Sequence, residues 1–212
     1  MRHRRTMVQA RSRMTRERVL EAATRLVLER GHEALAMKDL VELSGVSNGS
    51  IFHHFGSRDG VLEEIFKRER REYLAFVSRG TLDYDGDPCE ALGEGARASL
   101  MYQARDPQRY YRLNAQFSNS EWLREKQQMW NDLAADIERP VIEWAMPHLA
   151  AGRLPMLPPA LIQSLLLGPP ELVCNQWRNG RIGGKLEDHA DFVAEYVTAG
   201  MKRLRELTAA TP

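Results

Sequence analysis

The chain has 212 residues, of which 43% are hydrophobic, and a formal net charge of +1, a composition that excludes wholesale disorder and indicates a globular protein with a buried core. Two cysteines, Cys89 and Cys174, are too few for a disulfide framework and lack the paired spacing of a zinc site. No apolar run approaches the roughly 18 residues of a membrane helix, and no apolar stretch follows the basic N-terminus as in a secretory signal. We therefore expect a cytoplasmic protein with no membrane partner, no cofactor and no metal.

Charge is distributed unevenly along the chain. Residues 1–80 carry a net charge of +5, residues 81–212 carry −4, and the first 30 residues contain nine Arg and three Glu. A basic end on an acidic body is typical of a protein that meets phosphate at one end, whereas the alternative is an Arg-rich leader without a partner. We expect residues 1–14 to form a basic disordered arm.

Helical periodicity begins directly after this arm. One buried face is predicted from the three-and-four spacing of Val19, Ala22, Ala23, Leu26 and Val27. Thr15 is a candidate N-cap for this helix, and Gly31 is a candidate end. A short helix over 38–44, a turn, a second short helix from Asn48 and a longer helix capped by Ser57 follow.

Beyond the turn-rich stretch 83–88, the pattern predicts helices over 88–105, 107–117, 120–147, 159–179 and 187–207. Pro140 should kink the third of these helices, and the pair Pro169 and Pro170 should kink or split the fourth. The fold class is all-α. We expect a three-helix helix-turn-helix domain over 15–60 and a larger helical domain for effector binding and dimerisation over 61–212.

The run from Gly45 to Phe55 has the pattern of two helices joined by a tight turn. Gly45 suits the left-handed conformation that such a turn requires, and Val46 is an apolar plug between the helices. Ser47 can cap the second helix, in which Ile51 and Phe55 lie four residues apart and face the core.

The opposite side of this second helix is small and polar. It contains Gly49, Ser50, His53 and His54, and such a face is what reading the major groove requires. An ordinary helical hairpin with a glycine turn is the alternative. A metal site at the adjacent histidines is not expected, because no third ligand lies at a suitable spacing.

The stretch from Arg16 to Leu62 resembles the DNA-binding domain of the TetR family of bacterial transcription regulators. The matching residues are Val19 to Ala23, Gly31, Asp39 and Leu40, the run from Gly45 to Phe55, Ser57 to Asp59, and Leu62. The resemblance implies a sequence-specific DNA-binding regulator, more often a repressor than an activator, that is released from its operator by a small apolar or amphipathic ligand.

The resemblance also implies roles for individual residues. Ser50 and His53 would contact base edges, His54 and Arg58 would contact phosphate, and the start of the second helix would favour phosphate. The implied DNA-binding set is Ser47, Asn48, Gly49, Ser50, Phe52, His53, His54 and Arg58.

Two positions depart from the family pattern. Phe52 stands where tyrosine is usual, and Ala36 stands where a threonine often caps the helix and contacts the DNA backbone. Losing both removes two hydrogen bonds, each worth about 1 kcal/mol net. The early arginines can compensate by contacting the minor groove or phosphate, as basic arms do in other DNA readers.

Aromatic, Met and Cys side chains gather in the second half of the chain and suggest an apolar ligand chamber. The candidate lining residues are Met101, Tyr102, Tyr110, Phe117, Trp122, Trp130, Trp144, Cys174 and Trp177. The alternative is that these side chains simply fill the core.

The last two long helices carry apolar and small residues at the spacing of packed helices, which predicts a four-helix homodimer interface. The candidate residues are Leu161, Leu165, Gly168, Leu172, Leu186, Ala190, Val193, Val197, Gly200 and Leu204. A seam within one subunit is the alternative. A dimer suits near-palindromic double-stranded operator DNA, because it doubles the contacts of one helix-turn-helix.

Two other classes of protein are alternatives. An enzyme is not expected, since the sequence has no Gly-rich phosphate loop, nucleophile elbow or catalytic triad, and no catalytic residue is assigned. A helical interaction module without DNA binding is the second alternative, and it would show no sequence preference for DNA.

Overall fold

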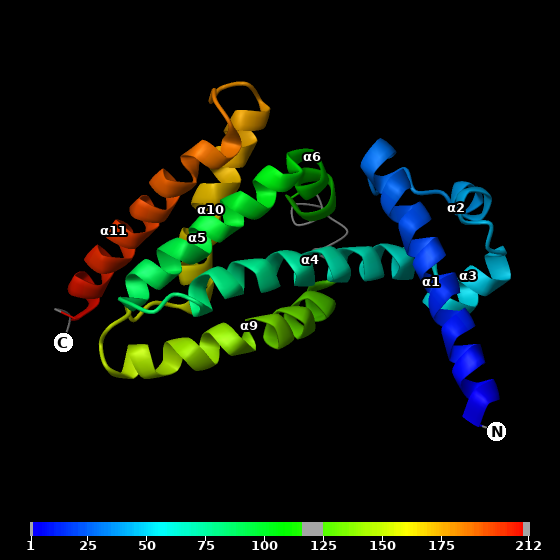
Figure 1. The fold of residues 1–212 in the computed structure, drawn as a ribbon, viewed down its shortest axis with the longest axis horizontal. Coiled ribbons are helices and arrows are strands. Elements are labelled where there is room, and N and C mark those ends of the chain that lie inside the picture. Colours follow the sequence, from blue (N-terminus) through cyan, green and yellow to red (C-terminus); the bar gives the residue numbers. More distant parts are fainter. Residues whose placement is uncertain (1, 116–124, 210–212) are drawn as a thin grey trace. The chain divides into compact units, whose positions relative to one another are not determined.

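The computed structural model describes residues 2–115 and 125–209, and within these ranges the chain is helical with no strand (Figure 1). The elements in chain order are α1 (Arg2–Arg30), α2 (Met37–Ser44), α3 (Asn48–Phe55), α4 (Arg58–Leu82), α5 (Pro88–Arg105), α6 (Pro107–Tyr110), a π-helix (Tyr111–Ala115), α9 (Gln127–Ala150), α10 (Pro159–Arg178), a 3-10 helix (Leu186–His189) and α11 (Ala190–Ala209). The predicted all-α fold is confirmed. None of the described helices is long and apolar enough to cross a membrane.

The chain divides into two compact units. The N-terminal unit comprises Met1–Arg70 and Gln108–Glu125, and the C-terminal unit comprises Arg71–Pro107 and Lys126–Pro212. The chain passes from the first unit to the second inside helix α4, and not at the predicted domain boundary after residue 60.

The first helix is longer than predicted. Helix α1 extends from Arg2 to Arg30, so the expected disordered arm over 1–14 is helical from its second residue. The stretch contains no Gly or Pro and is rich in Arg and Met, which are good helix formers. Thr15 consequently caps nothing, and its hydroxyl donates to the carbonyl of Arg11 (3.0 Å). Gly31 ends the helix as predicted, at φ 85°.

The core of the N-terminal unit is formed by the predicted face of α1 together with α2, α3 and the first half of α4. Its fully enclosed side chains include Val19, Ala23, Val27, Leu40, Ile51, Val61, Leu62 and Ile65. One buried charge lies beside this core. Glu69, which is 1% exposed, accepts hydrogen bonds from the Nε (3.2 Å) and Nη2 atoms of Arg109.

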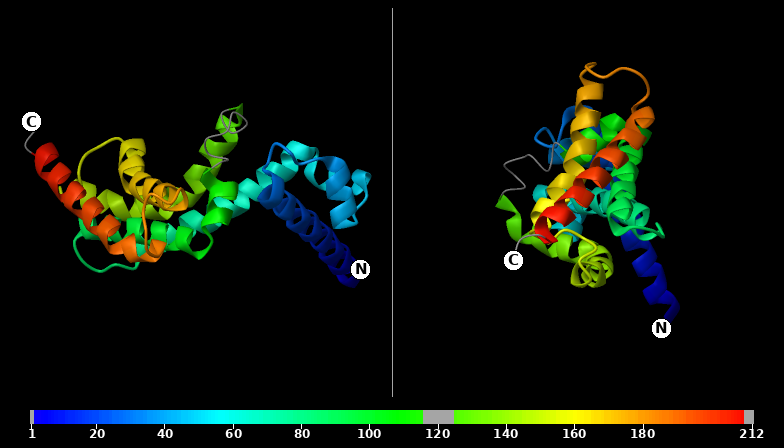
Figure 2. Two further views of the ribbon diagram at one scale, coloured as in Figure 1. Left: turned by 90° about the horizontal axis from the view of Figure 1, so that it is seen from above. Right: turned by 90° about the vertical axis from the view of Figure 1, so that its left-hand side faces the viewer.

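In the C-terminal unit, helices α5 and α11 lie side by side (Figures 1 and 2). The reason is a glycine. A Cβ atom at Gly93 would stand 2.8 Å from the carbonyl oxygen of Ala194 and would also meet the hydroxyl of Thr198, so only glycine allows this approach. Two ion pairs join the same helices, Lys202 with Glu90 (2.6 Å) and Arg205 with Asp87 (2.9 Å).

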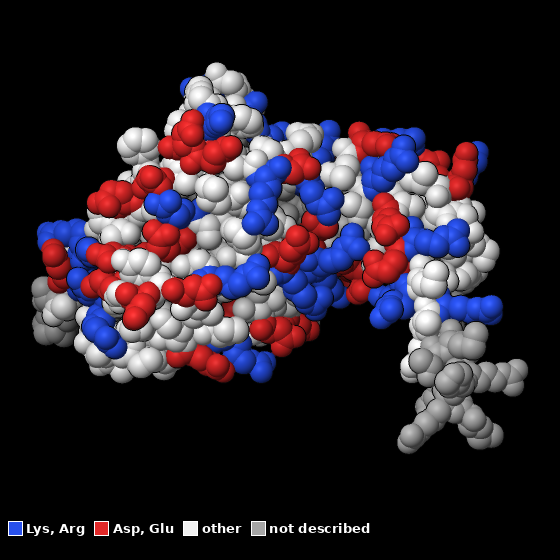
Figure 3. Space-filling view, in the orientation of Figure 1, with Lys and Arg blue, Asp and Glu red and all other residues white. Residues whose placement is uncertain are grey.

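The prolines do not interrupt their helices. Pro140 lies inside α9, and Pro169 and Pro170 lie inside α10, so the predicted alternative of a split at this pair is wrong, while the predicted kinks stay predictions. The predicted helix over 107–117 begins at Pro107 but changes to a π-helix at Tyr111. On the face shown in Figure 3, acidic and basic side chains are interspersed over the C-terminal unit.

Candidate nucleic-acid interface and apolar cavity

Helices α2 and α3 form a helix-turn-helix with the predicted turn chemistry. Gly45 caps α2 in the left-handed conformation (φ 62°), and its amide donates to the carbonyl of Val41. Val46 is buried between the helices. The Ser47 hydroxyl caps α3 by accepting from the amide of Ser50 (3.3 Å). These expectations from the sequence are confirmed.

Helix α3 has one buried side and one open side. Ile51 is fully enclosed and holds the helix against the core. Ser47, Asn48, Gly49 and His53 are exposed, and a Cβ atom at Gly49 would meet nothing within 4 Å. The open side is therefore small and polar, and a second macromolecule could approach its backbone closely.

The remaining predicted contact residues on α3 are less uniform. Ser50 and His54 are half-buried, whereas Phe52 is 46% exposed and offers an apolar ring where a tyrosine would offer a hydroxyl. Phe55, expected in the core, is only half-buried and lies under the guanidinium of Arg16 (4.8 Å to the ring centroid). Ala36 is the N-cap residue of α2 and makes no side-chain capping bond, because its methyl group cannot accept a hydrogen bond.

Two arginines of α1 fix the helix-turn-helix, and sequence reasoning assigned them no role. Arg16 donates to the carbonyl of His54 (2.9 Å) and to the carboxylate of Glu64 (2.7 Å), and so ties the end of α3 to α4. Arg18 donates to the carbonyl of Ser44 (2.6 Å) at the turn. No local spacing in the sequence signals bonds across 26 to 48 residues.

Arg58 does not have the free guanidinium that a phosphate contact would use. Its Nε donates to the carbonyl of Leu35 (2.6 Å), and its Nη2 donates to the carbonyls of His32 (2.8 Å) and Glu33 (3.0 Å). These bonds hold Arg58 within the protein, and its DNA-backbone role stays a prediction. Arg58 satisfies carbonyl groups in the loop after α1, because a planar fork of donors matches several acceptors at once.

The adjacent histidines are not brought into a metal site. The rings of His53 and His54 lie edge to face, 5.2 Å apart between centroids. Within the described ranges, no group of three His, Cys, Asp or Glu side chains could hold a metal ion. Partial burial, followed by the charges of His53 and Arg16, lowers the pKa of His54.

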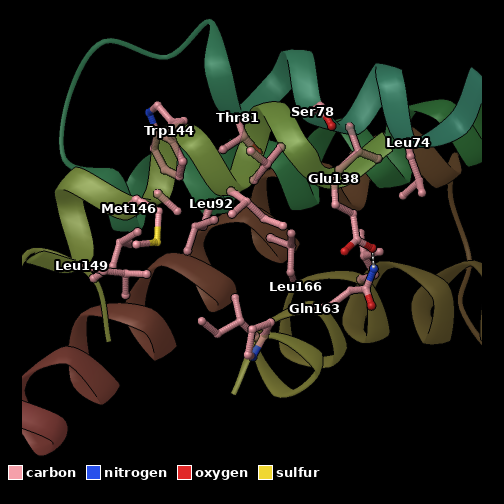
Figure 4. A pocket seen from close by; sticks show the side chains of 18 of the residues that line it. Leu74, Ser78, Thr81, Leu92, Glu138, Trp144, Met146, Leu149, Gln163 and Leu166 are labelled. Carbon is pink, nitrogen blue, oxygen red and sulfur yellow. Dashed lines mark hydrogen bonds between the residues drawn. The ribbon is translucent and has the colours of Figure 1, made fainter. Parts of the chain in front are cut away.

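The C-terminal unit encloses an apolar cavity of about 250 Å³ between α4, α9 and α10 (Figure 4). Helix α4 contributes Leu74, Val77, Ser78 and Thr81 to its wall. Helix α9 contributes mostly aliphatic side chains together with Trp144, Met146 and Glu138, and α10 contributes Gln163. Glu138 accepts a hydrogen bond from Gln163 across the cavity (2.7 Å).

The cavity is not the predicted chamber. Among the predicted lining residues that the structure describes, only Trp144 belongs to its wall. Cys174 is enclosed in the core, and Trp177 packs against that core. Tyr102 meets the ring of Tyr73 edge to face and lies tilted against Phe76. Tyr110 is buried in the N-terminal unit, and Met101 is 39% exposed. Phe117 and Trp122 and the side chain of Trp130 lie outside the described residues. The core alternative thus applies to Cys174 and Trp177.

The predicted dimer residues divide into two groups. Leu186, Ala190, Val193 and Val197 are at most 5% exposed and pack into the core that α5 and α11 share, so the expectation that they face a second subunit is wrong. Leu204 also packs against this core. The spacing of the apolar residues predicted which side of α11 is buried. It did not predict what covers that side, which is α5 of the same chain.

The second group lies open. Leu161, Leu165, Gly168 and Leu172 form an exposed stripe along α10, and Gly200 is exposed on α11. Two large side chains of α11 that the sequence did not single out, Phe192 (75% exposed) and Tyr196 (70% exposed), line a groove of about 450 Å³ with Leu172. Their apolar character could have been noticed, but they lie outside the main heptad-like seam.

Comparison with known sequences supports the helix-turn-helix assignment. A family model described as "Bacterial regulatory proteins, tetR family" matches residues 19–65. The HTH-type transcriptional repressor AcnR of Corynebacterium efficiens is 32% identical over 122 residues, which cover 56% of this chain and 57% of that protein. The HTH-type transcriptional repressor KstR2 of Mycobacterium tuberculosis is 32% identical over 77 residues, 36% of this chain and 38% of that protein. The chain thus spans about half, or less, of the length of these curated relatives.

Solved structures share the fold over nearly the whole chain. A TetR family transcription regulator from Marinobacter aquaeolei has a TM-score of 0.69 at 17% identity and covers 91% of this chain, with 98% of its own length matched. The transcriptional regulator FadR from Bacillus subtilis, solved with stearoyl-CoA, has a TM-score of 0.65 at 16% identity, with 87% and 98% covered. At these identities the likeness shows the fold. Residues 19–65 thus match the TetR family of bacterial regulatory proteins, in agreement with the turn geometry, and the chain shares the fold of solved TetR family regulators.

Proposed function

We propose that this protein is a transcription repressor that binds near-palindromic operator DNA as a homodimer and is released by a small apolar or amphipathic ligand. The observation that carries the proposal is the open side of α3, which is small, polar and backed by the enclosed Ile51. A helix of this kind fits the major groove, and Gly49 lets its backbone come close to the bases. The relatives named above as repressors support the direction of regulation.

The contact set that we propose is narrower than the sequence alone suggests. Asn48, Ser50 and His53 would contact base edges, and the free amides at the start of α3 would contact phosphate. Arg58 is left out because loop carbonyls occupy its guanidinium. The exposed Arg11 and Arg13 on α1 would add phosphate contacts.

The DNA claim is tested by selecting duplexes from a random pool with the full chain in the presence of competitor DNA. We expect an inverted repeat. Asn48→Ala and His53→Ala should each lower affinity for the selected site by about tenfold, since one good base contact is worth about 1–3 kcal/mol. Asn179→Ala is the matched control, because Asn179 is exposed on the C-terminal unit. Recovery of no motif would instead indicate an interaction module without sequence preference.

The role of the basic end of α1 is tested separately. Deleting residues 1–12 removes arginines that we expect to contact phosphate, so affinity should fall and its dependence on salt should become flatter. Each lost phosphate contact should reduce the slope of log affinity against log salt by about 0.9. An unchanged slope would show that these arginines do not meet DNA.

We propose that the homodimer forms through the exposed apolar side chains of α10 and α11. Leu161, Leu165 and Leu172 would pack with Phe192 and Tyr196 against the same residues of a second subunit, because a two-fold interface is self-complementary. Leu165→Glu and Phe192→Glu should give monomers in sedimentation experiments. Met156→Glu, at an apolar residue of the loop before α10 that is more exposed than Leu165 and nearly as exposed as Phe192, should leave the dimer intact.

For release, we propose that the ligand occupies the cavity of the C-terminal unit and acts through α4. Leu74, Val77, Ser78 and Thr81 of α4 line the cavity, while the first residues of the same helix follow α3 directly. A ligand that binds more tightly when α4 is displaced would favour that displaced position of α4. Because α4 follows α3, this would move α3 out of the position that binds DNA. Filling the cavity by Ala145→Trp should abolish the ligand response and leave operator affinity intact.

A further inference from the structure

The described wall of the cavity carries negative charge and no positive charge. Its described wall is almost entirely aliphatic and aromatic, and Glu138 is the one charged side chain in it. The other polar groups of the wall are the hydroxyls of Ser78 and Thr81 and the amide of Gln163. No Lys, Arg or His of the described wall offers a positive charge to a ligand.

The carboxylate of Glu138 is only partly satisfied within the protein. Its Oε1 atom accepts one hydrogen bond from the amide of Gln163 (2.7 Å), and no described Lys, Arg or His forms an ion pair with it. A carboxylate has about four acceptor positions, and it favours donors that carry positive charge. Glu138 therefore keeps acceptor capacity for a group inside the cavity.

The polar and apolar parts of the wall lie at different ends. Figure 4 shows Glu138 and Gln163 toward the end near Leu74, with Trp144 and Leu149 toward the other. Along α9, Leu149 follows Glu138 by 11 positions, which corresponds to about 16 Å of helix at 1.5 Å per residue. A ligand spanning the cavity would meet a carboxylate at one end and hydrocarbon over the rest of its length.

We propose that the effector class of this protein is a lipophilic ammonium compound, whose apolar body fills the cavity and whose positively charged nitrogen binds the carboxylate of Glu138. The proposal rests on the ligand-release function proposed above, since it names the ligand class of that site. An anionic head group is disfavoured, because the described wall offers it no cation and the carboxylate would repel it. An ammonium group gains a partner and avoids the cost of an unpaired charge in an apolar site.

The test compares three probes with one apolar body by calorimetric titration of the full chain without DNA. The probes are 4-phenylbutylammonium, 4-phenylbutan-1-ol and 4-phenylbutanoate, which differ in the charge of the polar end. We expect the ammonium to bind at least about tenfold more tightly than the carboxylate, because like charges in one site repel and opposite charges attract. Equal or tighter binding of the carboxylate, or no binding of any probe, overturns the proposal.

Three variants locate the effect. Glu138→Gln keeps the shape of the side chain and removes its charge, so it should weaken ammonium binding by about fivefold while the alcohol binds as before. Asp136→Asn, which removes the same charge from an exposed position of the same helix, should change neither affinity. Ala145→Trp should abolish binding of both. Ammonium binding that survives Glu138→Gln or Ala145→Trp contradicts the assignment, and because no DNA is present, this failure is distinct from a failure to select an operator.

Discussion

Different interactions fix the helices inside each of the two units. In the N-terminal unit, arginine side chains bind main-chain carbonyl groups and carboxylates across the helices, as Arg16, Arg18 and Arg58 do. In the C-terminal unit, α5 and α11 are joined by close backbone approach at Gly93 and by an apolar core. Both units have an apolar core, and two ion pairs also connect α11 with the start of α5. The difference lies in what positions one helix: bonds from arginines to main-chain carbonyls position α3, whereas close backbone packing positions α11.

The largest expected effect is at the buried charge of the N-terminal unit. Arg109→Ala should lower the free energy of unfolding by about 3 kcal/mol, because it leaves Glu69 enclosed without its main partner. Urea unfolding followed by circular dichroism measures the loss. The double variant Arg109→Ala with Glu69→Leu should recover most of it, since no charge then remains buried. An equal loss in the double variant would show that the unit depends on packing here, as the C-terminal unit does.

Arg58→Ala should cost about 2 kcal/mol of stability, because it removes charge-assisted hydrogen bonds to loop carbonyls. The salt dependence of DNA binding, measured where the variant is fully folded, should be unchanged. A slope reduced by about 0.9 would restore the phosphate role that the sequence suggested.

Two glycine substitutions compare the units directly. Gly93→Ala should destabilise the protein by about 1 kcal/mol, because the strain of overpacking against α11 exceeds the gain in helix propensity. Gly49→Ala should stabilise it by about 0.5 kcal/mol, because the new methyl group lies in open space within α3. The same Gly49→Ala protein should bind its operator more weakly. Thermal unfolding and a binding titration separate the two effects, and equal operator affinity would mean that α3 does not approach the bases closely.

The smallest expected effect is a pH dependence in the N-terminal unit. Burial lowers the pKa of His32, with Glu33 opposing this shift and Arg58 adding to it. The unfolded chain therefore takes up the proton near pH 6.5 while the folded chain does not. Stability should be full above this pH and should decline as the pH falls through it, until the folded state is protonated too. His32→Asn should flatten this part of the urea-unfolding profile, and an unaltered profile would assign the decline to other groups.

The sequence predicted the N-terminal unit better than the C-terminal one, for a physical reason. Gly45, Val46 and Ser47 make contacts with residues only a few positions away, so the local sequence is enough to predict the geometry of the turn. The buried side of α11 was predicted correctly from its period, but a period does not reveal whether the covering helix belongs to the same chain. The sequence did not reveal the cavity, because its wall is mostly aliphatic and aliphatic side chains also fill ordinary cores.

The bonds of Arg58 show a second limit of sequence-based prediction. A basic side chain at a family position for phosphate contact is recognisable, but its competition with three carbonyls depends on how the loop after α1 folds. The same holds for Arg16, whose partners lie 38 and 48 residues away. Helix boundaries follow from local propensity, while long-range hydrogen bonds follow only from the fold.

The passage of the chain between units inside α4 has a consequence for how such proteins diversify. The N-terminal unit is made of two separated stretches, Met1–Arg70 and Gln108–Glu125, with α5 encoded between them. Exchange of the C-terminal unit as one continuous segment would divide helix α4 and separate Arg109 from Glu69. Substitutions within the cavity wall leave both of these connections of the chain intact.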